Sequence, residues 1–288
     1  MTITRERLAG LARETLAILE AGEYRNAAGD PVSIRPLLDR AIAGTESFPP
    51  NRELPAVAPG NRPTRITVDN LTTLAAAQEL IAEGFRPVAL NFASAKNPGG
   101  GFLTGARAQE ESLARSSGLY PCIATSPMYE YHRAQRDLMY SHYAIYSPAV
   151  PVIRSDGGRM LDRPFCCAFI TCPAVNAGVV LQREPARQPE IRTTMAGRVA
   201  RVLSIAAFKG HEAVVLGAWG CGVFGNDPRE IAELFRDALS GPFRGAFARV
   251  SFAIIERSAG GTTRPTFERV FDGLVASGVT GGPPGSSG

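Results

Sequence analysis

The chain has 288 residues, of which 44% are hydrophobic and 20% are charged, and its formal net charge is +4. This composition is typical of a globular protein and excludes a disordered or fibrous chain. The pI near 8.9 favours an anionic partner, but the basic residues are scattered along the chain. We therefore expect no direct nucleic-acid binding.

The N-terminus begins Met-Thr-Ile-Thr-Arg-Glu-Arg and lacks the apolar core of a signal peptide. No stretch approaches the roughly 20 apolar residues that a membrane helix needs, so we expect a cytoplasmic protein with no membrane contact. Apolar residues at helical spacing predict an amphipathic helix over residues 4–22, and a second helix is expected over 34–43. The proline-rich stretch 48–63 is interpreted as a connector. Residues 1–64 are thus predicted to be an N-terminal helical extension and connector.

Short apolar runs then alternate with helical patterns, which predicts an α/β domain over residues 65–275 with helices on both faces of its sheet. Asn70 is expected to cap a helix over 71–83. Strands are predicted at 65–68, 87–92, 144–146, 150–153, 165–172, 213–216 and 250–255. The other helices are expected near 107–117, 127–142, 188–209, 228–239 and 265–275. Residues 281–288 have no apolar side chain, and residues 276–288 are predicted to be a disordered tail.

The cysteines and histidines indicate neither a disulfide framework nor a metal centre. The five cysteines form no C-x-x-C pair, and those at 166, 167 and 172 read as small apolar residues of a buried strand. His132, His142 and His211 show no ligand spacing, so no metal and no cofactor are expected. The aromatic and basic stretch over 129–136 is interpreted as one face of an amphipathic helix.

A first glycine-rich loop follows the buried strand at 87–92 and contains Gly99, Gly100 and Gly101. Consecutive glycines allow the backbone to approach a ligand closely, but taken alone they are more typical of a flexible loop or hairpin. The neighbouring acids Glu110 and Glu111 come soon afterwards, at the start of a predicted helix. The helix dipole favours carboxylates there, so capping alone could explain them.

A second glycine-rich loop, residues 216–227, connects a strand to a helix for which Asp227 and Pro228 are good first residues. Backbone N–H groups of such a turn can bind phosphate oxygens. Gly220, Gly222 and Gly225 satisfy the Rossmann spacing, but no acidic residue for a ribose follows near the required twenty positions. The loop is therefore interpreted as a phosphate-binding turn rather than a Rossmann turn, and a purely structural turn is the alternative.

Together the two loops resemble those of the bacterial-type poly(ADP-ribose) glycohydrolases, a branch of the macrodomain superfamily. The resemblance rests on Gly99-Gly100-Gly101 followed by Gln109-Glu110-Glu111, and on residues 217–226 as the diphosphate loop. It covers residues 65–275 and includes an N-terminal helical extension. It implies a macrodomain-like mixed sheet flanked by helices, an enzyme that acts on poly(ADP-ribose) and ADP-ribosylated proteins, and ADP-ribose as the product. A monomer is expected by default.

The resemblance also implies roles for individual residues. Glu111 would protonate the leaving ribose hydroxyl and then act as base for a water, while Glu110 would orient the reacting ribose. Asn97 would hydrogen-bond ribose hydroxyls, or would simply form an Asn-Pro turn. Phe224 would pack on the distal ribose, or would cover the core. Phe267 would form a wall of the adenine pocket. The predicted substrate-binding residues are Asn97, Gly99, Gly100, Gly101, Gln109, Gly220, Cys221, Gly222, Val223, Phe224, Gly225, Asn226 and Phe267.

The acid role sets a physical condition on Glu111. A helix N-terminus and the nearby Arg107 favour an ionised carboxylate, whereas a general acid must hold its proton. We therefore expect Glu111 to be at least half buried at the floor of the cleft.

The sequence is compatible with two other functions. A macrodomain-like module could bind ADP-ribose without cleaving it, but such a module has no need of paired acids beside the glycosidic bond. An α/β nucleotide-binding protein that attaches to nucleic acid would need a contiguous basic surface, and the sequence contains no basic cluster.

Overall fold

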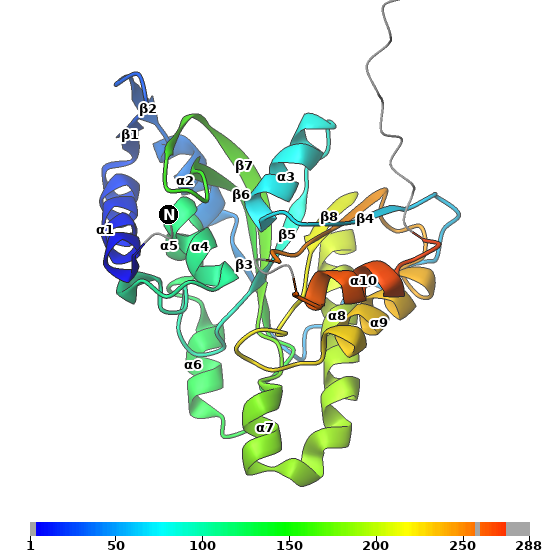
Figure 1. Cartoon of the computed structure of the whole chain (residues 1–288). Coiled ribbons are helices and arrows are strands. Elements are labelled where there is room, and N and C mark those ends of the chain that lie inside the picture. Colours follow the sequence, from blue (N-terminus) through cyan, green and yellow to red (C-terminus); the bar gives the residue numbers. More distant parts are fainter. Residues whose placement is uncertain (1–3, 257–259, 275–288) are drawn as a thin grey trace, which may run out of the picture.

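A computed structural model of the chain describes residues 4–256 and 260–274 (Figure 1). A seven-stranded mixed sheet with the order β3-β6-β7-β5-β8-β9-β4 forms its centre, and a small second sheet pairs β1 with β2. The strands are β1 (Glu23–Arg25), β2 (Pro31–Ser33), β3 (Glu46–Phe48), β4 (Arg65–Asp69), β5 (Val88–Phe92), β6 (Ala144–Arg154), β7 (Met160–Cys172), β8 (Ala213–Leu216) and β9 (Arg249–Ala253).

Helices cover both faces of the large sheet. They are α1 (Arg5–Ala21), α2 (Arg35–Ala43), α3 (Thr73–Ala82), α4 (Gln109–Ser116), α5 (Leu119–Ile123), α6 (Pro127–Ala134), α7 (Ala177–Arg183), α8 (Gln188–Phe208), α9 (Pro228–Ser240) and α10 (Thr263–Val270), with 3-10 turns η1 (Phe102–Thr104) and η2 (Pro185–Arg187). One core cluster joins the sheet to α7, α8, α9 and α10, and another joins its opposite face to α2, α3, α4, α5 and α6. The predicted mixed sheet between helices is confirmed.

The sheet topology brings the two glycine-rich loops together. Strand β5 pairs in parallel with both β7 and β8. The loop after β5 and the loop after β8 therefore leave the same edge of the sheet from neighbouring strands. In open α/β sheets this edge, at the carboxyl ends of parallel strands, is where ligands bind.

Several predicted elements differ in their limits. The predicted helix over 127–142 ends at Ala134, and the predicted strands at 144–146 and 150–153 are one strand, β6, with a register shift between Ser147 and Val150. Asn70 does not cap α3; Thr72 does, by accepting a hydrogen bond from Ala75 N. The side chain of Asn70 instead bonds to the backbone of Glu256. The short elements β1, β2, β3, α5 and α7 were not predicted.

The N-terminal segment is integrated with the large sheet. Strand β3 lies at its edge and pairs antiparallel with β6. Helix α1 packs near α4, and the Thr15 hydroxyl donates to the Arg115 carbonyl oxygen at 2.6 Å. The segment predicted as an extension thus supplies an edge strand. The tail predicted at 276–288 lies outside the described residues, and within the described part no helix has the length and apolar character needed to cross a membrane.

Candidate functional site

Two adjoining cavities open at the carboxyl ends of β5, β8 and β9, with volumes of about 650 and 380 Å³. They share five wall residues, Phe92, Ala108, Gln109, Ala218 and Gly222. The smaller cavity is bordered by Glu110 and Glu111 from α4 and by the loop after β8. The two cavities therefore form one continuous cleft with a carboxylate pair in one part.

The carboxylate pair is buried, with 3% of Glu110 and 8% of Glu111 exposed. Glu110 Oε2 accepts a hydrogen bond from Ser94 N at 2.7 Å. Glu111 Oε1 accepts one from Gly101 N at 2.9 Å, whereas its Oε2 is buried and has no partner among the described residues. The expected burial of Glu111 beside the glycine loop is thus observed.

The triple glycine makes room for both acids. Gly100 has a φ of 59°, and a Cβ atom built there would lie 2.3 Å from Glu111 Oε1 and 3.1 Å from Glu110 Oε2. A side chain at this position would displace a carboxyl group and strain the backbone. The loop therefore closes over the acids rather than lying apart from them.

Burial is the main cause that raises the pKa of Glu110 to about 8, and the nearby charge of Glu111 acts in the same direction. Hydrogen bonds from the Ser94 backbone oppose this shift. The raised pKa favours the protonated form of Glu110 at neutral pH.

Gln109 anchors the start of α4 to the sheet. Its Oε1 accepts from Phe92 N at 2.9 Å, and its Nε2 donates to Leu90 O at 2.8 Å and to Thr73 Oγ1 at 3.0 Å. The side chain borders both cavities, but the protein itself engages its amide. The position of the two acids that follow is consequently tied to β5.

The loop after β8 forms the wall opposite the acids. Gly220, Gly222, Val223 and Phe224 border the smaller cavity, and Cys221 borders the larger one. Among residues 4–256 and 260–274, the backbone N–H groups of 222, 223 and 224 have no hydrogen-bond partner. Three such donors in succession can receive an anionic ligand.

Residues further along this loop shape it from outside the cleft. The Asn226 side chain is buried and donates to Val175 O at 2.7 Å and Gly220 O at 3.2 Å. Asp227 caps α9 by accepting from Arg229 N and Glu230 N, as predicted. In the described part of the chain, Gly225 and Asn226 border neither cavity.

The structure does not bring Asn97 and Phe267 into the cleft. Within the described residues Asn97 is exposed and borders neither cavity. Phe267 is fully buried, with its ring 5.5 Å from that of Phe252. It belongs to the core because α10 packs its apolar face on α9. Its position therefore gives no support to the predicted adenine wall.

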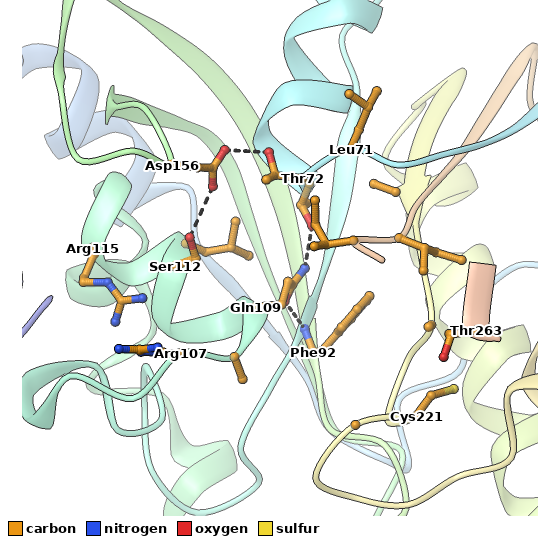
Figure 2. Close-up of a pocket in the computed structure, with 18 of the residues that line it drawn as sticks. Leu71, Thr72, Phe92, Arg107, Gln109, Ser112, Arg115, Asp156, Cys221 and Thr263 are labelled. Atoms are coloured by element: carbon orange, nitrogen blue, oxygen red, sulfur yellow. Dashed lines mark hydrogen bonds between the residues drawn. The ribbon is translucent and has the colours of Figure 1, made fainter. Parts of the chain in front are cut away.

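The larger cavity contains walls that the sequence did not single out (Figure 2). At one end, the Asp156 carboxylate accepts hydrogen bonds from the hydroxyls of Thr72 and Ser112, at 2.5 and 3.2 Å. Leu71, Phe92, Ile254 and Ile255 line the same cavity and supply apolar surface. Ile254 and Ile255 directly follow the last buried strand, a position from which their place at the ligand-binding edge could have been predicted.

Asn91 is a further buried polar residue beside the acids that was not predicted. It is fully buried at the end of β5, donates to Thr171 Oγ1 at 3.1 Å and lies 3.5 Å from Glu110 Oε1. An asparagine within an otherwise apolar strand is the signal that could have identified it. In the described residues, no three His, Cys, Asp or Glu side chains lie together as a metal site would require.

Comparison with known proteins agrees with this geometry. The family model described as microbial-type PARG, catalytic domain, matches residues 12–155. The structure of a poly(ADP-ribose) glycohydrolase from Thermomonospora curvata is similar, with 45% identity, a TM-score of 0.87, and coverage of 92% of this chain and 100% of that one. No curated protein matches the chain.

Two further structures contain ligands. The Thermomonospora curvata enzyme bound to the inhibitor ADP-HPD shares 44% identity, with a TM-score of 0.84 and coverage of 92% of this chain and 99% of that one. The Deinococcus radiodurans enzyme in complex with ADP-ribose shares 41% identity, with a TM-score of 0.77 and coverage of 82% and 98%. The buried acid pair, the two glycine-rich loops and these similarities lead to one conclusion: the chain belongs to the microbial-type poly(ADP-ribose) glycohydrolases.

Proposed function

We propose that this chain hydrolyses the ribose–ribose O-glycosidic bonds of poly(ADP-ribose) and releases ADP-ribose, with Glu111 as general acid and then general base. The observation that carries the proposal is the buried acid pair beside the triple glycine. It lies in the same cleft as the three unpaired backbone N–H groups at 222–224. One cleft thus combines an acid pair with donors for a diphosphate.

The ligand would lie along the cleft with its charged and apolar parts separated. The diphosphate would accept hydrogen bonds from the backbone N–H groups of 222–224. The adenine would enter the larger cavity, where Phe92, Ile254 and Ile255 supply apolar surface. The distal ribose would then lie between Phe224 and the acid pair, which border the smaller cavity.

In the first step, Glu111 would give its proton to the ribose oxygen of the leaving unit as the C1–O bond breaks. The electron pair of that bond leaves with the oxygen, and an oxocarbenium-like ribose remains. Ionised Glu111 would then take a proton from the water that attacks this carbon, which regenerates the acid. Support comes from the buried Glu111 Oε2, which has no partner among the described residues.

Burial raises the pKa of Glu110 to about 8, so the carboxyl group beside Glu111 holds a proton at neutral pH. Backbone donors at Ser94 and Gly101 fix one oxygen of each carboxyl group. Glu110 would use its remaining oxygen to orient the reacting ribose.

The test compares the wild type with Glu111→Gln on automodified poly(ADP-ribose). We expect free ADP-ribose only with the wild type, since an amide cannot supply the proton. ADP-ribose binding should persist in the variant because glutamine has nearly the same shape. Equal turnover by both proteins would refute the role of Glu111, and a wild type that releases no ADP-ribose would refute the function.

We also propose that the enzyme acts as a monomer on the polymer and on ADP-ribosylated proteins. Both cavities are walled by residues of a single chain. Light scattering of the active enzyme should give the mass of one chain. A stable dimer at catalytic concentrations would contradict this part of the proposal.

A cytoplasmic location is the last part of the proposal. All five cysteines are free thiols, including the adjacent Cys166 and Cys167, and such thiols persist in a reducing compartment. Cell fractionation with an antibody to the native chain tests this, and recovery outside the cytoplasm would overturn it.

A further inference from the structure

The segment between α6 and β6 contains a backbone conformation that side chains rarely adopt. Tyr140 has a φ of 59°, in the left-handed region. Among the described residues, Ala149 is the other non-glycine residue with a positive φ. A bulky residue keeps such a conformation only where its surroundings enforce it, and such residues cluster at functional sites.

Both neighbours of this tyrosine are anchored. On one side, Met139 N donates to Asp137 Oδ1 at 2.9 Å, and the Met139 carbonyl oxygen accepts from the fully buried guanidinium of Arg198. Asp137 is in turn paired with Arg187 at 2.9 Å. These contacts hold the chain as it enters the left-handed turn.

On the other side, the Ser141 hydroxyl lies 2.7 Å from Nε2 of His132, and Ser141 N donates to the same nitrogen at 3.3 Å. This leaves Nδ1–H of His132 to donate to the Ala95 carbonyl oxygen at 3.2 Å. Burial lowers the pKa of His132 to about 4, which keeps the ring neutral for this arrangement. The segment is thereby joined to the loop that contains the triple glycine.

The ring of Tyr140 reaches the opposite loop. Its centroid lies 6.5 Å from that of Phe224 and 5.7 Å from that of His132. Phe224 borders the smaller cavity together with Glu110 and Glu111. The tyrosine ring therefore stands between the histidine that holds one loop and the aromatic residue that projects from the other.

We propose that Tyr140 is a positioning residue, whose left-handed backbone holds its ring against Phe224 and so fixes the distal ribose relative to Glu111. This inference rests on the proposed function. The neighbouring 222–224 segment has few internal contacts, since its N–H groups are unpaired within the described residues and Val223 is 90% exposed. Such a loop needs contacts from outside to hold Phe224 in one position for a substrate.

The substitution Tyr140→Gly separates positioning from stability. Glycine adopts a positive φ without steric conflict, so the melting temperature should stay unchanged or rise although the ring is lost. We expect kcat on poly(ADP-ribose) to fall by about tenfold to a hundredfold, since small misplacements of a reacting group have effects of this size. The Kd for ADP-ribose should change less than kcat does, because the proposed adenine contacts in the larger cavity do not involve Phe224.

Two variants serve as controls. Tyr140→Phe keeps the ring and should retain at least about half of the wild-type kcat. Ala149→Gly relieves the other positive φ, at the register shift of β6. Among the described residues Ala149 borders neither cavity, so this variant should leave kcat unchanged. A wild-type kcat in Tyr140→Gly would overturn the proposal, as would an equal loss in Ala149→Gly.

A double-mutant cycle keeps the proposal falsifiable if Tyr140→Gly proves unstable, since Tyr140→Leu can take its place. When Tyr140 acts through Phe224, removing its ring in a Phe224→Ala background should cause little further loss of kcat. Additive losses would overturn the proposal. An inactive wild type would instead refute the proposed function, so the two failures are distinguishable.

Discussion

At the scale of single residues, the two adjacent glutamates have different surroundings although both are buried. Glu110 is held by Ser94 N and lies near the Asn91 amide, whereas Glu111 is held at one oxygen by Gly101 N and keeps the other without a partner. A carboxyl group that donates and then accepts a proton needs such a free oxygen. The different contacts support a division of roles between acid and orienting residue.

The buried Glu110 predicts a pH-dependent stability. Its pKa is raised from 4.5 to about 8, chiefly by burial. Between these values the folded state holds a proton that the unfolded chain has released. The contribution of Glu110 to the free energy of unfolding should therefore fall as pH rises from about 4.5 to about 8, by up to about 1.4 kcal/mol per pH unit, and this contribution should change no further above that range.

Glu110→Gln should remove this contribution. Chemical denaturation of both proteins from pH 5 to 8 measures it, and the difference between them cancels other groups such as His132. Parallel curves for wild type and variant would contradict a raised pKa at Glu110.

Gly100→Ala tests how tightly the glycine loop surrounds the acids. The new Cβ would lie 2.3 Å from Glu111 Oε1 on a backbone with a φ of 59°. We expect kcat to fall by about a hundredfold through displacement of the carboxyl group, and stability to fall by roughly 1–2 kcal/mol from the backbone conformation. Kinetics and thermal denaturation measure the two effects.

Gly210→Ala is the matched control. Gly210 has a φ of 72°, and a Cβ there would meet no atom within 4 Å. It should lose similar stability and keep full activity. If both variants lost activity equally, backbone strain rather than contact with Glu111 would be responsible.

At the scale of elements, helix ends determine where the functional loops begin and end. Helix α9 starts directly after the glycine-rich loop that follows β8, and Asp227 Oδ1 accepts from Arg229 N at 2.7 Å and Glu230 N at 3.1 Å. This cap was predictable because Asp before Pro is a common helix start. By contrast, the end of α6 at Ala134 was not predicted, since the segment that follows is held in part by the distant Arg198, which donates to the Met139 carbonyl oxygen.

Removal of the α9 cap should have a measurable effect. Asp227→Ala should lower the free energy of unfolding by about 1 kcal/mol, because two backbone N–H groups lose their acceptor. Asp227→Asn should be nearly neutral, since asparagine caps helices equally well. Urea denaturation distinguishes the two, and an equal loss in both would indicate that charge rather than capping matters.

At the scale of the whole molecule, the first 64 residues belong to the structure that forms the cleft. Phe48 is fully buried at the edge strand β3, and Ile34 and Leu38 are buried in α2 and the turn before it. Leu8 of α1 borders the larger cavity. We infer that the division into an extension before residue 65 and a catalytic domain after it does not mark an independently folding unit.

A chain that starts at residue 65 should consequently fail to fold. It would lose the partners of several buried side chains, each worth about 1.5–3 kcal/mol, against a typical total stability of about 5–15 kcal/mol. Circular dichroism and denaturation of the truncated chain measure this, with residues 1–64 added in trans as the control. Cooperative unfolding of the truncated chain alone would refute the expectation.

Much of the architecture was determined by local sequence patterns. Apolar periodicity predicted α1, α8 and α9 almost to their ends, and short, mainly apolar runs predicted β5 and β8, because these signals depend on neighbouring residues alone. The two glycine-rich loops and the acid pair were likewise evident from residue types and order. Such local features are sufficient to identify the family.

Long-range contacts decided the rest. Three features depend on which elements pack together. These are the burial of Glu111, the hydrogen bonds of Gln109 to β5, and the position of Phe267 in the core rather than in the cleft. The same holds for β3, whose three residues become a strand only through pairing with β6, and for the left-handed backbone of Tyr140. Chain pattern determined the residues of the site, and tertiary packing determined their burial, partners and protonation, because these properties depend on atoms that are distant in sequence.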